Sequence, residues 1–133
     1  MIIIEKSAKT IDDAVNAALN ELGVTKEEVR EKMAVSLQIM KAATEKAVQE
    51  DIKSMGGLIG GEAKKLTKYR GSSRSVCGEL MNKAMVAAMG TMEVNASMGL
   101  IVAAPTASSC GILPGAVVTI GKEYGFSDDE MID

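Results

Sequence analysis

The chain has 133 residues, of which 47% are hydrophobic and 25% are charged. This length is enough for one domain with a modest core, and the balance is that of a globular protein rather than a disordered one. The net charge of −3 at pH 7 argues against a nucleic-acid-binding protein, because the chain offers no excess of positive charge to phosphates.

The sequence contains no targeting or membrane signal. It has no run of about 18 consecutive apolar residues, so no transmembrane helix is expected. The isoleucines near the N-terminus are followed at once by Glu5 and Lys6, which does not indicate a signal peptide. We therefore expect a cytoplasmic protein. Its cysteines, Cys77 and Cys110, are not spaced as a metal clip and are expected to be reduced thiols.

The residues available for a core favour a mainly α-helical fold. Only three residues are aromatic, whereas ten are methionines, so the core has to be built from Leu, Ile, Val, Met and Ala. These side chains suit closely packed helices.

The first elements are a possible short strand over Met1–Glu5, which is a β-branched run, and a helix over Lys9–Leu22. Thr10 is the expected N-cap of this helix, Asp13 holds the capping-box position, and Gly23 ends it. Its apolar face has four members: Ile11, Val15, Ala18 and Leu22.

The next helix is predicted over Thr25–Ile52. Thr25 and Glu28 have the spacing of a capping box. Apolar residues then recur at steps of three and four, which indicates one continuous stripe that faces a core or a partner. The stripe consists of Val29, Met33, Leu37, Met40, Ala47 and Val48.

A glycine-rich segment, Ser54–Gly61 (SMGGLIGG), interrupts the helical pattern. Glycine pairs allow positive φ angles or a close backbone approach. The segment is not a phosphate-binding P-loop, because Glu62 and Ala63 follow where that motif has Gly–Lys–Ser/Thr. It is either a hinge between helices or a backbone wall beside a substrate.

A basic segment, Glu62–Arg74, follows. Its five cations are Lys64, Lys65, Lys68, Arg70 and Arg74. Such a run is typical of a solvated helix face. The alternative is that one cation neutralises a substrate carboxylate, and arginine is the better candidate because its planar fork binds carboxylates through two bonds.

A methionine- and alanine-rich helix is predicted over Ser75–Met92, loosened at Gly90 or Thr91. Its inner side is expected to consist of Val76, Leu80, Ala84, Ala87 and Ala88.

Three hydroxyl residues, Thr106, Ser108 and Ser109, lie between two predicted helices. A preceding helix is expected to stop at Pro105. The following helix, Ala116–Tyr124, should start around Ile112–Pro114 and direct free backbone amides towards the hydroxyls. Such an arrangement is a plausible pocket for a carboxylate or a phosphate. The alternative is that these residues only turn and cap the chain.

A last helix is predicted to start at Ser127, with Glu130 three residues later. The sequence ends at Asp133, after barely one turn, and a helix of that length does not hold itself. We therefore expect that the chain is cut in the middle of an element.

Three segments carry a family resemblance: MGGLIGGEAKKL (55–66), EVNASMGLIVAAPTASSCGILPG (93–115) and GFSDDEMI (125–132). In order and spacing they resemble the α chain of bacterial iron–sulfur-dependent L-serine dehydratases, with its GG(D/E)A, N-A-x-x-G and A/T-P-T-x-x-x-x-G-x-x-P-G blocks. The resemblance extends from about Glu28 to the C-terminus. The first thirty residues instead resemble, more weakly, the small N-terminal domain of Jag-type RNA-binding proteins. We therefore divide the chain into segments 1–24 and 25–133.

The resemblance implies part of a lyase that converts L-serine to pyruvate and ammonia. In that family three cysteines hold a [4Fe–4S] cluster, and they lie in a part of the α chain that this sequence lacks. No cluster or other metal is expected on this chain alone, and Cys110 is not assigned as a ligand. The implied partners are L-serine, the rest of the α chain and the β chain, with neither nucleic acid nor membrane.

The residue inventory favours binding over chemistry. The chain has no histidine, which excludes Ser–His and Cys–His nucleophile systems, and catalytic residues stay unassigned. The residues expected to contact substrate are Asn95, Thr106, Ser108, Ser109 and Gly111. The alternative is a non-catalytic helical interaction module of the same family. Apolar surface left uncovered by the missing part of the α chain would also favour a homo-oligomer.

Overall fold

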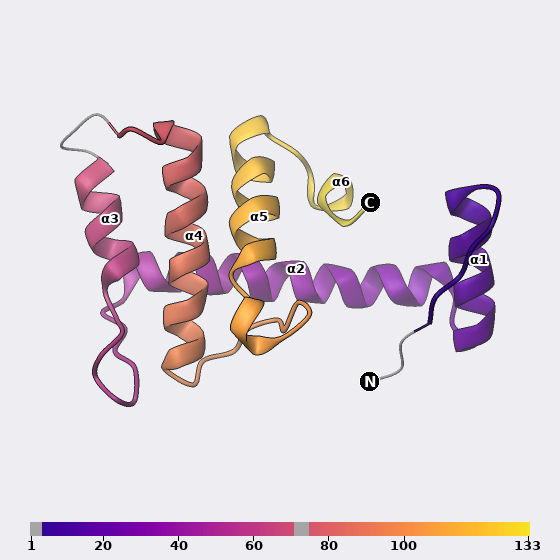
Figure 1. Ribbon diagram of the computed structural model, residues 1–133, viewed down its shortest axis with the longest axis horizontal. Helices are drawn as coiled ribbons and strands as arrows, with labels where there is room; N and C mark the ends of the chain where they lie inside the picture. The colour runs from indigo at the N-terminus through magenta and orange to yellow at the C-terminus, as the bar shows by residue number, and fades with distance from the viewer. Residues whose placement is uncertain (1–3, 71–74) are drawn as a thin grey trace.

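The long helix α2 (Lys26–Gln49) is the element against which the rest of the chain is arranged. In the computed structural model, which describes residues 4–70 and 75–133, three helices stand side by side across α2 (Figure 1). They are α3 (Glu62–Arg70), α4 (Gly78–Ala96) and α5 (Ile112–Tyr124). No strand occurs within the described ranges, so the mainly α-helical fold class is confirmed. Of the expected strand, residues 1–3 lie outside those ranges, while Ile4 and Glu5 have no regular structure.

The N-terminal helix boundaries follow the predicted caps. Helix α1 (Ile11–Leu22) begins after Thr10, whose Oγ1 accepts the Asp13 amide at 3.2 Å, and it ends at Gly23 in a left-handed conformation. The capping box at the start of α2 is also confirmed, although α2 ends at Gln49 rather than at Ile52.

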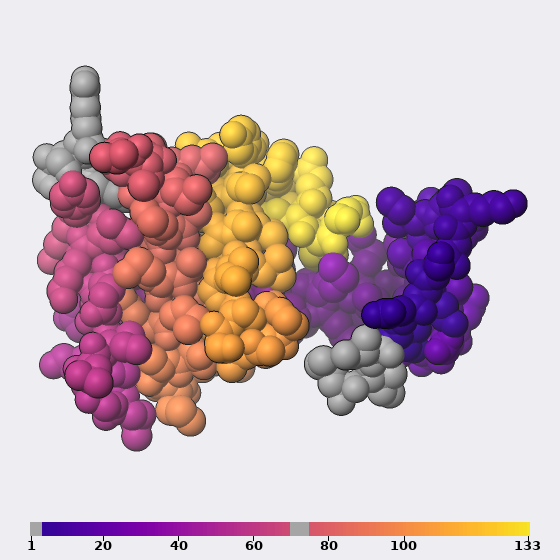
Figure 2. Space-filling model, viewed as in Figure 1, coloured from indigo at the N-terminus to yellow at the C-terminus, as the bar shows by residue number. Residues whose placement is uncertain are grey.

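The apolar face of α1 is not part of the core. No residue of α1 is buried, and Ile11 is 83% exposed. Figure 2 shows α1 as a separate lobe at one end of the molecule, because α2 carries it beyond the reach of α3, α4 and α5. The amphipathic pattern therefore predicted the helix correctly, but it did not predict whether another element would bury its apolar face.

The core forms where α2 meets the other helices, in two clusters. One joins α2 to α3 and α4 and consists of Ala43, Ala47, Ile52, Ala63, Val86 and Val94. The other joins α2 to α5 and α6 and consists of Leu37, Met40, Val118 and Ile132. The predicted stripe of α2 is thus buried at Leu37, Met40 and Ala47, whereas Met33 is exposed.

Helix α4 differs from its prediction in its start and in its inner face. It begins at Gly78, so Val76 precedes the helix and is exposed, and Leu80 is exposed as well. The expected loosening at Gly90 or Thr91 does not occur, because the helix continues to Ala96. The side of α4 that is buried consists of Asn82, Val86, Ala87, Gly90, Thr91, Glu93 and Val94.

The expectation that a helix runs up to Pro105 is wrong. Helix α4 ends at Ala96, and Met98 takes a left-handed conformation with φ 63°. The Gly99 amide then donates to the carbonyl of Val94 at 2.8 Å, which turns the chain away from the helix axis. Residues 99–103 have no regular structure, and the Ala104–Pro105 peptide bond is cis.

The C-terminal helices begin where they were predicted. Helix α5 starts at Ile112, with Pro114 in its first turn, and α6 (Asp128–Ile132) is capped by Ser127 and Glu130. The Asp128 carboxylate joins α6 to Lys41 and Gln38 of α2. Within residues 4–70 and 75–133, none of the helices combines the length and hydropathy needed to cross a membrane.

Candidate functional site

The last turn of α4 lies between two loops that the sequence singled out. The glycine-rich loop, residues 54–61, and the hydroxyl loop, residues 97–111, both meet the end of the bundle at which α4 terminates (Figure 1). Glu93 and Asn95 of this turn point about 200° apart, since each helical residue advances about 100°. As a result, Glu93 reaches the glycine-rich loop and Asn95 reaches the hydroxyl loop.

The hydroxyl loop brings its three predicted residues together. Oγ1 of Thr106 lies 3.0 Å from Oγ of Ser108 and 3.0 Å from Oγ of Ser109. Ser109 Oγ also lies 3.2 Å from the carbonyl oxygen of Ala104, across the short 3-10 turn η1 (Ala107–Ser109). Thr106 and Ser108 are exposed, and Ser109 is half-buried. These residues therefore cap a turn and also present their hydroxyls at the surface.

Asn95 and Gly111 fix the position of this loop. The Asn95 side-chain amide donates to the Ala107 carbonyl at 3.0 Å. Gly111 is buried, and a β-carbon there would lie 2.5 Å from the carbonyl oxygen of Ala88, so only glycine allows the loop to approach α4 this closely. Direct contact of either residue with a substrate stays a prediction.

The glycine-rich loop is held by two carboxyl groups. Glu93 is 2% exposed, and its oxygens accept the amides of Ala63 at 2.7 Å and of Gly61 at 3.1 Å. Glu62 accepts the Gly60 amide at 2.7 Å. That amide, followed by the backbone of Glu62 itself, lowers the pKa of the Glu62 carboxyl group.

Sequence reasoning did not single out Glu93. The available signal was its place on the helix: it follows Gly90 by three residues and Val86 by seven, which puts an acidic side chain on the apolar stripe of α4. An acidic residue on such a stripe is rarely buried unless it is paired or hydrogen-bonded.

The structure describes only one of the two arginines proposed for a substrate carboxylate, because Arg74 lies outside the described residues. Arg70 ends α3, and this end of the helix lies near the start of α4, at the opposite end of the bundle from the hydroxyl loop (Figure 1). Lys64 binds Asp51 at 2.6 Å, and this contact lowers the pKa of Asp51.

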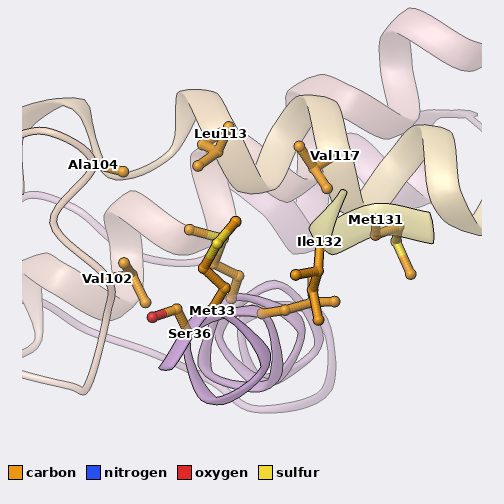
Figure 3. Close-up of a pocket in the computed structure, with 10 residues that line it drawn as sticks. Met33, Ser36, Val102, Ala104, Leu113, Val117, Met131 and Ile132 are labelled. Atoms are coloured by element: carbon orange, nitrogen blue, oxygen red, sulfur yellow. The ribbon is translucent and has the colours of Figure 1, made fainter. Parts of the chain in front are cut away.

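An apolar pocket of about 320 Å³ lies behind the hydroxyl loop, between α2, α5 and α6. Figure 3 shows Met33, Val102, Leu113 and Ile132 around it, with Ser36 as a polar neighbour. Ala104 lines this pocket and also belongs to the hydroxyl loop, where its carbonyl accepts a hydrogen bond from the Ser109 hydroxyl. The pocket suits an aliphatic group better than a carboxylate.

The cysteines do not fit an iron–sulfur cluster, which requires three or four thiolates. The chain has two cysteines; Cys77 is exposed at the start of α4, and Cys110 is buried with its sulfur 3.5 Å from that of Met92. Burial raises the pKa of the Cys110 thiol, which opposes ligation. In the described part of the chain, no three His, Cys, Asp or Glu side chains converge as metal ligands.

Comparison with known proteins identifies relatives of the whole chain. A model of the serine dehydratase alpha chain family matches residues 3–133. The chain is 39% identical over 123 residues to the L-serine dehydratase alpha chain of Peptoniphilus asaccharolyticus, a match that covers 92% of this chain and 42% of that protein. It is 40% identical over 108 residues to the probable L-serine dehydratase alpha chain of Bacillus subtilis, covering 81% and 36%.

The extent of these matches corrects one expectation. The family model begins at residue 3, well before Glu28, where the resemblance was expected to begin. The Jag-type resemblance and the division at residue 24 stay predictions. The chain spans 42% and 36% of the length of these two relatives. No solved structure is significantly similar to the chain.

Proposed function

Because the chain belongs to the serine dehydratase alpha chain family, we propose that it forms part of an L-serine dehydratase, which converts L-serine to pyruvate and ammonia. Its own contribution is to bind the substrate through the hydroxyl loop. Its relatives are an L-serine dehydratase alpha chain and a probable one, and these names support the substrate and the reaction class. The alpha-chain naming supports a partner chain, which we take to be the β chain.

The observation that carries this proposal is the exposed group of hydroxyls. The hydroxyl oxygens of Ser108 and Ser109 each lie 3.0 Å from Thr106 Oγ1. Each hydroxyl can donate one hydrogen bond as well as accept. A substrate carboxylate would accept the hydrogen bonds that these hydroxyls now donate to one another. Two or three neutral donors would then orient the substrate.

The remaining groups support that loop. Asn95 holds the Ala107 carbonyl, and Gly111 lets the loop approach Ala88. No residue of this chain is assigned to proton transfer. The thiolates of a [4Fe–4S] cluster would have to come from residues outside this chain.

The test uses the complete enzyme: this chain combined anaerobically with the remaining α-chain portion, a β chain, iron and sulfide. Wild type should form pyruvate from L-serine. The double variant Thr106→Ala/Ser108→Ala should raise KM about tenfold or more, because two hydrogen bonds to a charged group are lost. Ser36→Ala is the matched control, since the Ser36 hydroxyl bonds to its own helix at Lys32. An unchanged KM in the double variant would remove the loop from the substrate site.

A second candidate function is the non-catalytic interaction module. It is favoured by an open apolar groove of about 570 Å³ between α4 and α5, lined by Leu80, Met81, Met85, Ile112 and Ile120 among others. Four of these residues are 37–72% exposed: Leu80, Met81, Ile112 and Ile120. If the reconstituted wild-type enzyme assembled but formed no pyruvate, the module would become the better assignment.

A further inference from the structure

Glu93 is a buried acidic side chain whose hydrogen-bond partners lie outside its own helix, α4. It is 2% exposed, and both carboxyl oxygens accept amides from another element, at the end of the glycine-rich loop and in the first turn of α3. Removing a carboxyl group from water is unfavourable unless hydrogen bonds replace the hydration. Here two backbone amides replace it, and the carboxyl group in turn satisfies amides at the start of α3 that have no partner within their own helix.

We infer that Glu93 is a positioning residue of the substrate site: its carboxyl group fixes the Gly61–Ala63 backbone, at the end of the glycine-rich loop, against the same turn of α4 that holds the hydroxyl loop through Asn95. This inference rests on the proposed function, which places the hydroxyl loop at the substrate, and it takes the glycine-rich loop as the backbone wall beside that substrate.

The glycine-rich loop needs such an anchor because it has few side chains of its own to hold it. Gly60 has φ 145°, and a β-carbon there would lie 2.2 Å from the Ile52 carbonyl oxygen, so the loop passes too close to Ile52 for any side chain at this position. Its amides reach α4 at Glu93 and at the Ala96 carbonyl, which accepts the Met55 amide at 3.4 Å. One turn of α4 therefore anchors both loops, and releasing Glu93 would free one of them relative to the other.

Two substitutions of Glu93 test whether its carboxyl group holds the glycine-rich loop. In Glu93→Gln the side chain keeps its length, but one oxygen becomes an NH₂ group. Only one of the Gly61 and Ala63 amides can then keep an acceptor, because an NH₂ group accepts no hydrogen bond. In Glu93→Asp the carboxyl group is retained but withdrawn by one methylene. Asn82→Ala is the matched control: Asn82 is 2% exposed on the same helix, and its side chain bonds only to Gly78 among the described contacts.

The first measurement is amide hydrogen exchange by NMR on the 133-residue chain. In Glu93→Gln the Gly61 or Ala63 amide should exchange about tenfold faster. The Gly115 amide, which bonds to Gly111 at 2.9 Å, should not change. If Glu93→Gln does not fold, Glu93→Asp carries the same test. Unchanged exchange at both Gly61 and Ala63 overturns the inference.

The second measurement is steady-state kinetics of the complete enzyme with L-serine. We expect Glu93→Gln to raise KM several-fold with kcat within about twofold, and Glu93→Asp to restore part of the difference. Faster exchange with an unchanged KM, or an equal rise of KM in Asn82→Ala, would show a purely structural residue and overturn the inference. If wild type has no activity, the proposed function fails and the substrate role of Glu93 fails with it, while the exchange data still decide whether Glu93 anchors the loop.

Discussion

Gly90 of α4 lies directly against Ala47 of α2. A β-carbon on Gly90 would stand 2.8 Å from the β-carbon of Ala47 and 3.5 Å from that of Ala63. This contact brings α2, α3 and α4 together at one point, and it explains why a glycine inside α4 does not loosen the helix. The β-carbons of Ala47 and Ala63 occupy the space that a side chain at position 90 would need.

Gly90→Ala should therefore destabilise the fold although alanine favours helices. Overpacking costs about 1–3 kcal/mol, and the helix propensity of alanine offsets about 1 kcal/mol of this. We expect a net loss of about 1 kcal/mol in the free energy of unfolding, measured by urea titration. Gly56→Ala is the control, because nothing lies within 4 Å of a β-carbon there. A Gly90→Ala protein at least as stable as wild type would contradict this packing.

Met98→Gly should stabilise the chain. Met98 is 81% exposed and has φ 63°, a conformation that costs a side-chain-bearing residue about 1 kcal/mol or more. Glycine removes that strain without loss of buried surface, so a gain of about 1 kcal/mol in the free energy of unfolding is expected. The check is thermal and urea unfolding. Met98→Ala should bring no such gain, since it keeps the β-carbon; equal gains in both variants would point to the methionine side chain instead.

Acid should release α6 from α2. Bonds from Lys41 first, and also from Gln38, lower the pKa of Asp128 below its usual 3.8, and the Ser127 backbone amide lowers that of Glu130 below 4.5. A carboxylate whose pKa is lower in the folded state stabilises it fully above the unfolded-state pKa. This contribution decreases as the pH falls through the folded-state pKa, that is, below about 4.

The measurement is the NMR shift of the Ile132 methyl groups between pH 7 and pH 3. Ile132 is 9% exposed and packs in the cluster with Leu37 and Met40. We expect the shift to move towards random-coil values in this range, and Asp128→Asn to show part of that change already at pH 7. A methyl shift that stays constant down to pH 3 would contradict the role of Asp128.

Sequence reasoning located the starts of α1, α2 and α6 because their signals are local. Thr10, Thr25 and Ser127 each accept an amide three residues ahead, an interaction that needs no tertiary contact. The inner face of α4 was predicted only in part: Ala87 is buried, whereas Leu80 is exposed. A helix rich in methionine and alanine has two plausible apolar sides, and only contact with α2 and α3 decides between them. The end of α4 was missed because its left-handed residue is Met98 rather than a glycine.

In the candidate site, too, local contacts could be predicted from the sequence and long-range contacts could not. The hydroxyls of Thr106, Ser108 and Ser109 are neighbours in sequence, so their meeting around one turn could be predicted. The contacts of Glu93 with Gly61 and Ala63 span about thirty residues and depend on how α3 packs against α4. Only the folded chain reveals them.

The hydroxyl loop is held by hydrogen bonds among its own residues. Because Thr106 shares its oxygen with both Ser108 and Ser109, and Ser109 reaches back to Ala104, the loop is already closed on itself. If the loop binds a substrate carboxylate as proposed, its O–H groups can turn from one acceptor to another while the backbone keeps its conformation. Such preorganisation would lower the entropy lost on binding.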